Sequence, residues 1–151
     1  MTAISLDFYQ KRTTEFLDAL ALIPDRARNI APAGEWSAAY IVHHIADGEI
    51  HFAGRYLLAL GSDNPTMFLF DEERYPEMLG YEKRSINKSL AAIVGIRATI
   101  LESLSNIDPK HWRRTMVRED GVTVTLEGLV HQADGHLAGH IDQLKTLASQ
   151  L

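Results

Sequence analysis

The sequence contains no cysteine and no long apolar run. The lack of cysteine excludes disulfides, thiolate nucleophiles, zinc ribbons and cysteine-ligated iron–sulfur clusters. Any metal site must therefore be built from histidine, aspartate or glutamate side chains. Since no segment approaches the roughly 20 apolar residues that a membrane helix needs, we expect no membrane association.

Positive charge is also scarce. The chain has 15 lysine and arginine residues against 20 acidic ones, and its formal net charge is -5. Nucleic-acid binding depends on clustered lysine and arginine, and no basic stripe is present, so we expect no nucleic-acid partner. Residues 1–12 show neither a basic region followed by an apolar run nor a small-residue cleavage site, which favours an unprocessed cytoplasmic protein.

The composition is that of a globular domain. With 151 residues, 46% of them apolar and 23% charged, the chain has the size and balance of one ordinary domain. No stretch combines the low hydrophobicity and high net charge of disordered segments, and neither a repeat nor a linker interrupts it. We therefore expect a single domain over residues 1–151.

Helical periodicity recurs in four segments. Apolar residues at a spacing of 3.6 predict helices over residues 5–23, about 37–60, about 82–105 and from 126 onward. Ser37 and Thr125 are the expected N-caps of the second and fourth helices. In the first and third helices, the apolar stripes include Leu17 and Val94. Four amphipathic helices of this length favour an all-α four-helix bundle.

The connections carry two further predicted elements. Residues 66–81 have no clear period and are interpreted as a long crossover connection with a short helix around Glu72–Met78. Residues 114–118 and 122–124 alternate in a β-like pattern, and the intervening Glu119-Asp120-Gly121 is typical of a hairpin turn. Because an isolated hairpin is marginally stable, this short hairpin before the last helix is expected to pack on the helices.

Two of the seven histidines stand four residues apart on the last predicted helix. At this spacing His136 and His140 lie one above the other, so their imidazoles are close enough to share one metal ion. His140 falls within the apolar arc of that helix and His136 falls at its edge. On the second helix, His44 borders the apolar arc, whereas His43 is expected to point roughly 100° further round, toward solvent. His44 is therefore the candidate third ligand, with hydrogen-bonded core histidines as the alternative.

Other polar side chains are candidates for catalytic or substrate-facing roles. Asp47 and His51 continue the border of the second helix, where solvated, hydrogen-bonded and substrate-facing roles are all open. Arg97 falls at the centre of the third apolar stripe and must be paired if it is buried. Its partner is expected to be a substrate carboxylate or one of three acids: Asp47, Glu49 or Asp142. The remaining histidines are expected at the surface or in loops: His43, His111 and His131.

Two motifs resemble those of a known family. Trp36-Ser37, with His44 eight residues after the tryptophan, resembles the first motif of the DinB/YfiT-like superfamily. The segment from His136 through His140 to Gln143 resembles the second motif of that superfamily, H-x-x-x-H-x-x-Q-[LI]. Together with the order of predicted elements between them, these motifs extend the resemblance over nearly the whole chain.

The resemblance implies a four-helix bundle, usually a homodimer, that binds zinc, nickel or iron. Its three ligands carry over to His44, His136 and His140. Many relatives place an aspartate after the first histidine of the pair, whereas this chain has Leu137, so any role of that acid is absent. Gln143 matches the motif and is expected to support a ligand rather than to be one.

The resemblance also implies a class of chemistry. The superfamily includes transferases and isomerases that use bacillithiol, mycothiol or glutathione. Three neutral imidazoles on a divalent ion leave a coordination position open, as in catalytic metal sites. We therefore expect a metal-dependent transferase or hydrolase with a small-molecule substrate, with a low-molecular-weight thiol as candidate co-substrate. The alternative is a non-catalytic metal- or ligand-binding module of a stress response.

Overall fold

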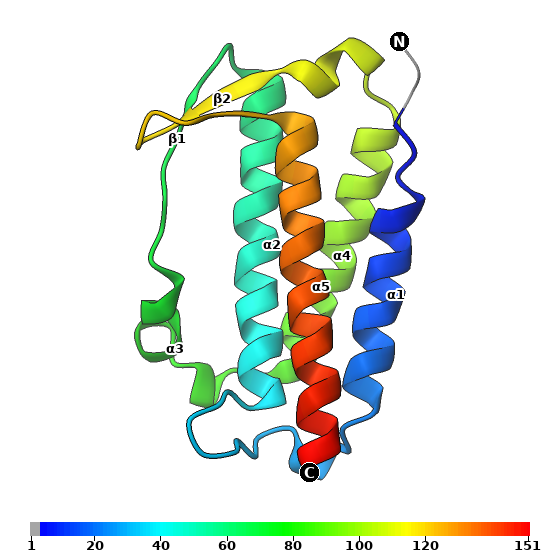
Figure 1. Ribbon diagram of the computed structural model, residues 1–151, viewed down its shortest axis with the longest axis vertical. Helices are drawn as coiled ribbons and strands as arrows, with labels where there is room; N and C mark the ends of the chain where they lie inside the picture. Colours follow the sequence, from blue (N-terminus) through cyan, green and yellow to red (C-terminus); the bar gives the residue numbers. More distant parts are fainter. Residues whose placement is uncertain (1–3) are drawn as a thin grey trace.

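Four long helices run side by side in the computed structural model, which describes residues 4–151 (Figure 1). They are α1 (Asp7–Ala21), α2 (Ala38–Gly61), α4 (Ile86–Ser105) and α5 (Leu126–Gln150). Helix α2 packs against α4 and α5, while α1 packs against the other side of the same two helices. The predicted all-α four-helix bundle is confirmed. Residues 1–3 lie outside the described residues. They belong to the expected domain over residues 1–151 and to residues 1–12, from which we expected an unprocessed chain.

Polar caps set where the helices begin. The Ser37 hydroxyl accepts a hydrogen bond from the Tyr40 backbone N–H at 3.2 Å, and the Thr125 hydroxyl accepts one from Gly128 at 3.0 Å. Both predicted N-caps are thus confirmed. The third long helix begins at Ile86 rather than near residue 82, because Ser85 caps it and the preceding residues form a separate 3-10 turn, Tyr81–Lys83.

The core contains two apolar clusters, one around Tyr9, Tyr56 and Trp112 and the other around Phe16, Ile41 and Leu137. Two predicted core side chains are in fact exposed: Leu17 at 37% and Val94 at 42%. Each follows directly after a fully buried residue, Phe16 or Ile93. One position along a helix turns the side chain by about 100°, which carries Leu17 and Val94 to the edge of the stripe.

The solvent-facing prediction for His43 is wrong, because the residue is fully buried. Residues 41–49 of α2 are all buried, since α4, α5 and the crossover connection cover this helix on several sides. His43 Nδ1 lies 2.8 Å from Ser89 Oγ of α4. The other two histidines expected outside the core agree better: His131 is exposed, and His111 is half-buried in the 3-10 turn Pro109–Arg113.

The hairpin before α5 is present and belongs to a small sheet. Its strands are β2 (Thr115–Arg118) and β3 (Thr123–Thr125), which pair antiparallel. A third strand, β1 (Thr66–Met67), pairs parallel with β2. The sequence did not indicate β1, because two residues are too few to show a strand period.

The crossover connection between α2 and α4 runs from β1 along the outside of α2 (Figure 1). It contains the 3-10 turn Glu72–Arg74 and the short helix α3 (Tyr75–Met78), which agree with the predicted short helix. Within residues 4–151, no helix is both long and apolar enough to cross a membrane. The path of the crossover matters because it brings side chains from a segment without periodicity against α2.

Candidate metal centre

Three histidines converge between α2 and α5. One ring nitrogen each from His44, His136 and His140 lies within 4.8 Å of those of the other two. The closest pair is His44 Nε2 and His136 Nε2, which are 2.9 Å apart. The His140 ring centroid is 4.7 Å from the centroids of both other rings. The structure therefore brings together all three histidines that the sequence singled out.

Small and aromatic neighbours fix where these rings lie. A Cβ atom at Gly48 would stand 3.5 Å from His136 Cε1, so the imidazole packs directly on the backbone of α2. The Trp36 ring meets His44 edge-on at 5.1 Å between centroids, and the Phe52 ring lies 6.0 Å from His136. Two aromatic side chains thus pack against two of the three histidines.

Burial keeps the histidines neutral. Burial, with a smaller contribution from repulsion by His140, lowers the pKa of His44 and of His136 to about 4. Burial also lowers the pKa of His140. At neutral pH all three imidazoles therefore have a nitrogen lone pair available, which is the form that binds metal ions.

Gln143 orients one of these rings. Its side-chain Oε1 lies 2.8 Å from His140 Nδ1. Because an amide oxygen only accepts hydrogen bonds, Nδ1 carries the hydrogen, and the lone pair stays on Nε2. Gln143 therefore supports the ring from behind, in the role expected from the sequence.

Glu72 is a site residue that sequence reasoning missed. Its carboxylate lies 3.8 Å from His44 Nε2. Since burial keeps His44 neutral, this contact is not a salt bridge. Glu72 stands in the 3-10 turn of the crossover, and no periodic pattern in that segment could have indicated where it packs.

Arg97 is buried but its partners come from the bundle itself. Its Nη1 donates to Glu49 Oε1 at 2.7 Å, its Nε to Thr13 Oγ1 at 2.7 Å, and its Nη2 to the Tyr9 carbonyl at 2.8 Å. Of the three acids proposed as partners, Glu49 is the one that binds it. Since each of the three guanidinium nitrogens has a partner, the geometry favours the salt bridge over a substrate contact.

Asp47 is also occupied by protein partners. Its carboxylate accepts hydrogen bonds from Tyr81 Oη at 2.7 Å and from Arg84 Nη1 at 2.8 and 2.9 Å. Tyr81 and Arg84 precede α4. Asp47 therefore ties the end of the crossover to α2 and does not belong to the group of histidines.

His51 ties the middle of the crossover to α2. Its Nε2 shares a hydrogen bond of 2.7 Å with Tyr75 Oη, and its ring stacks on Phe70 with 3.5 Å between centroids. Burial lowers the pKa of His51, so the neutral ring takes part in this contact. The hydrogen-bonded role is the one supported for this residue. Together with Asp47, it holds Glu72 near the histidines.

A family model described as the DinB superfamily matches residues 6–144. The chain belongs to the DinB superfamily. A relative from Halalkalibacterium halodurans, named "Putative metal-dependent hydrolase", is 27% identical over 133 residues, which are 86% of this chain and 74% of that protein. A relative from Oceanobacillus iheyensis with the same description is 24% identical over 74% of this chain and 66% of its own length.

Two solved structures share the fold. YfiT from Bacillus subtilis, described as a probable metal-dependent hydrolase with an unusual four-helix bundle topology, matches with a TM-score of 0.84 at 20% identity, over 99% of this chain and 90% of YfiT. A mycothiol-dependent maleylpyruvate isomerase matches with a TM-score of 0.74 at 16% identity, over 95% of this chain and 63% of the isomerase. At these identities the likeness shows a common fold and no more.

Proposed function

We propose that this DinB-superfamily protein is a metal-dependent enzyme that holds one divalent ion through His44, His136 and His140 and acts on a small molecule. The observation that carries the proposal is the convergence of three neutral, largely buried ring nitrogens within 4.8 Å of one another. These rings contact each other, Gln143 and the Glu72 carboxylate. Zinc, nickel and iron all accept imidazole ligands, so the donor set fits each of them.

The reaction class follows from the ligand number. An ion with three protein ligands keeps an open position, where it supplies a Lewis acid and lowers the pKa of bound water. Among the chain's own groups, Gln143 fixes the His140 tautomer, and Trp36 and Phe52 pack against His44 and His136. Glu72 Oε2, 3.8 Å from His44 Nε2, is placed to accept a hydrogen bond from the O–H group of a substrate or water. These roles suit hydrolysis or group transfer.

Each of these two reactions has support from one comparison. The relatives named as metal-dependent hydrolases favour hydrolysis of a small-molecule substrate. The common fold with a mycothiol-dependent isomerase favours a low-molecular-weight thiol as co-substrate for transfer. A cytoplasmic homodimer is part of the same proposal, and light scattering of the purified protein tests the dimer.

Elemental analysis of protein purified without an affinity tag or added metal tests the metal. We expect near one equivalent of zinc, nickel or iron per chain in the native protein and in His131→Ala, and almost none in His140→Ala. His131 is the matched control because it is an exposed histidine on the same helix. Equal metal in both variants contradicts the assigned ligands.

Turnover tests the enzyme. The metal-loaded protein is assayed with ester and amide substrates, and with electrophiles in the presence of glutathione, bacillithiol or mycothiol. We expect one of these reactions to depend on the ion and to fall at least tenfold in His140→Ala, since loss of metal ligation removes the Lewis acid. Full metal content with no reaction in any assay favours the non-catalytic module instead.

A further inference from the structure

Arg55 differs from the other arginines that the bundle covers. Every other arginine that is buried or half-buried in residues 4–151 has a carboxylate within 4.0 Å: Arg12, Arg28, Arg84, Arg97, Arg114 and Arg118. Half-buried Arg55 has none in this part of the chain. A charged group that is partly removed from water without a counter-ion is costly, so its lack of a partner calls for an explanation.

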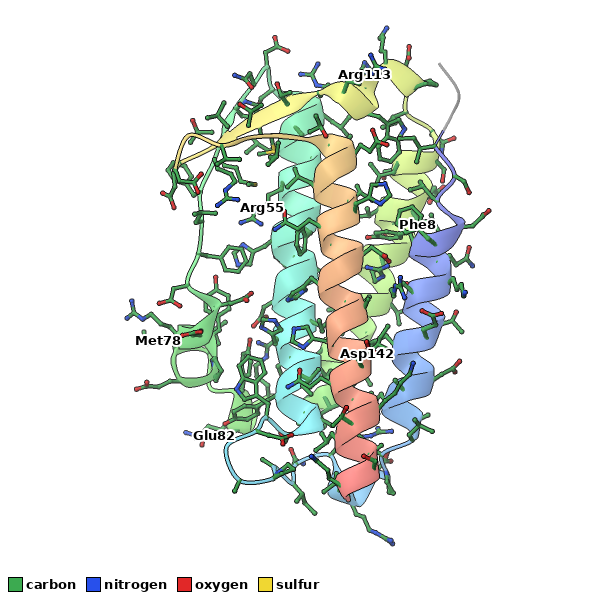
Figure 2. All side chains as sticks on the ribbon, viewed as in Figure 1. Phe8, Arg55, Met78, Glu82, Arg113 and Asp142 are labelled. Atoms are coloured by element: carbon green, nitrogen blue, oxygen red, sulfur yellow. The ribbon has the colours of Figure 1, made fainter. Side chains whose placement is uncertain are left out.

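The surroundings of Arg55 hold it in a fixed position. In Figure 2 its side chain extends from α2 toward the crossover connection. The guanidinium carbon lies 4.9 Å from the Phe70 ring centroid and 5.7 Å from that of Phe52. Nη2 donates to the Phe68 carbonyl at 3.2 Å. A guanidinium has five N–H donors, and the protein uses this one, which leaves most of them for another acceptor.

The positive charge of Arg118 adds to the electrostatic potential at Arg55. Burial lowers the pKa of Arg55, and the positive charge of Arg118 on β2 lowers it further. Arg118 pairs with Asp120, but its Nε is buried and has no hydrogen-bond partner in residues 4–151. Glu72 acts on Arg55 in the opposite direction, yet it lies in contact with His44 rather than with Arg55. Arg118 pairs with Met67 across β1 and β2, next to Phe68, so it is a second guanidinium near Arg55. Asp120 and Glu72 contact Arg118 and His44 rather than Arg55.

This region is close to the three histidines. His136 packs on Gly48, and the seven residues from Gly48 to Arg55 correspond to about 10 Å of helix rise. Side chains on a helix lean toward its N-terminus, which brings Arg55 over Phe52 and back toward the site. The Phe52 ring in turn lies 6.0 Å from His136. Phe52 thus contacts both Arg55 and His136, which places the guanidinium one aromatic side chain away from the histidine group.

We propose that Arg55, with Arg118 beside it, binds a carboxylate of the substrate whose other end lies at His44, His136 and His140. This inference rests on the proposed function and names its substrate class, a small molecule with an anionic end. The planar guanidinium lies between two aromatic faces, so its free edge accepts a planar carboxylate through paired hydrogen bonds. The competing assignment is a purely structural clamp that fastens Phe70 to α2.

Two thiols of equal length separate these assignments. The protein loaded with Co²⁺ is titrated with ω-mercaptohexanoate and with ω-mercaptohexanol, and binding is followed by the thiolate-to-cobalt absorption band. The thiol end occupies the metal, and the tail carries either a carboxylate or a neutral hydroxyl. We expect the acid to bind about tenfold more tightly than the alcohol, because a charge-assisted hydrogen bond is worth about this much.

The variants decide whether Arg55 is the cause. In Arg55→Met the acid is expected to lose its advantage, and in Arg55→Lys to keep part of it. Arg113→Met, which removes an exposed arginine at one end of the molecule (Figure 2), has the same change in net charge and should bind like the native protein. An unchanged preference for the acid in Arg55→Met and Arg55→Lys overturns the inference in favour of the clamp.

The same titration tells this failure from a failure of the proposed function. If the neutral thiol gives the cobalt band in every variant but the acid has no advantage in the native protein, the open metal position stands and the carboxylate site is wrong. If neither thiol gives the band and Co²⁺ does not bind, the metal centre itself is wrong, and the inference falls with it.

Discussion

Two buried polar clusters of this bundle include residues of α2 and differ in how their hydrogen bonds are made. One is Arg97 with Glu49 of α2, and the other is His44 of α2 with His136 and His140. Around Arg97, each guanidinium nitrogen donates to a partner, and the ring of Tyr9 lies 3.8 Å from its carbon. Around His44, its Nε2 and that of His136 stand 2.9 Å apart and share one hydrogen bond, and the His140 ring lies beside them. A group whose hydrogen bonds are all made within the bundle stabilises the fold, whereas imidazole nitrogens that converge on one point suit a cation.

Replacing Arg97 by Met should have the largest effect on stability. It leaves the Glu49 carboxylate buried without its partner, and breaking a buried ion pair in this way costs about 3–5 kcal/mol. Urea denaturation measures the free energy of unfolding, and metal content per folded chain should stay at the native level. The double variant with Glu49→Leu should recover much of the loss. A loss below about 1 kcal/mol in the single variant contradicts the structural role.

Replacing His136 by Leu should change metal content strongly and stability little, the reverse of the result expected for Arg97→Met. The variant should bind almost no metal, because one of three ligands is gone. Without metal, its free energy of unfolding should stay close to that of the native protein, since leucine is apolar and the lost hydrogen bond to His44 is worth only about 1 kcal/mol. Elemental analysis and urea denaturation are run on the same samples. If His136→Leu loses as much stability as Arg97→Met, the histidines also stabilise the fold, and the difference between the two groups is wrong.

Replacing Gln143 by Leu should weaken metal binding by about tenfold, because residues that hold a ligand from behind commonly contribute this much. The His140 ring then loses the hydrogen bond that fixes its tautomer. Competition with a chelator measures the affinity. Gln150→Leu, near the exposed end of the same helix, is the control, and an equal effect there contradicts the assigned role.

A pH titration of the metal-free protein should show how strongly burial acts on the histidine group. The folded pKa of His44 and of His136 is about 4, below the ordinary value of 6.5, so the unfolded chain binds more protons between these values. The free energy of unfolding should therefore fall as pH drops from 6.5 toward 4, by at least about 1 kcal/mol. In His136→Leu this fall should be shallower, and identical slopes contradict the shifted pKa values.

Much of the fold could be predicted because the helices depend on patterns among residues that are close together in the sequence. The caps at Ser37 and Thr125 and the apolar periods fix the helices. The four-residue spacing fixes the relation of His136 to His140. His44 follows from these once α2 and α5 are neighbours, which is why a sequence with the two motifs indicates the whole group of ligands.

The remaining features depend on contacts between distant segments. Burial of His43 requires α4 and the crossover to cover α2 on sides that its own period assigns to solvent. Likewise, the contacts of Glu72 and Arg55 depend on the course of the crossover. That course is fixed by β1 and by the stacking of His51 on Phe70. Such contacts leave no period in the sequence, so a segment without pattern can still carry part of a site.

The distance along the chain between the two halves of the site has a kinetic consequence. His44 and His136 are 92 residues apart, and closing so long a loop costs chain entropy before any contact is gained. Helix α2 is synthesised well before α5, so the site cannot assemble until the later helix has docked. In the proposed function, an ion held by both helices would act as a reversible cross-link. Its exchange with solution should be coupled to the opening of the contact between α2 and α5.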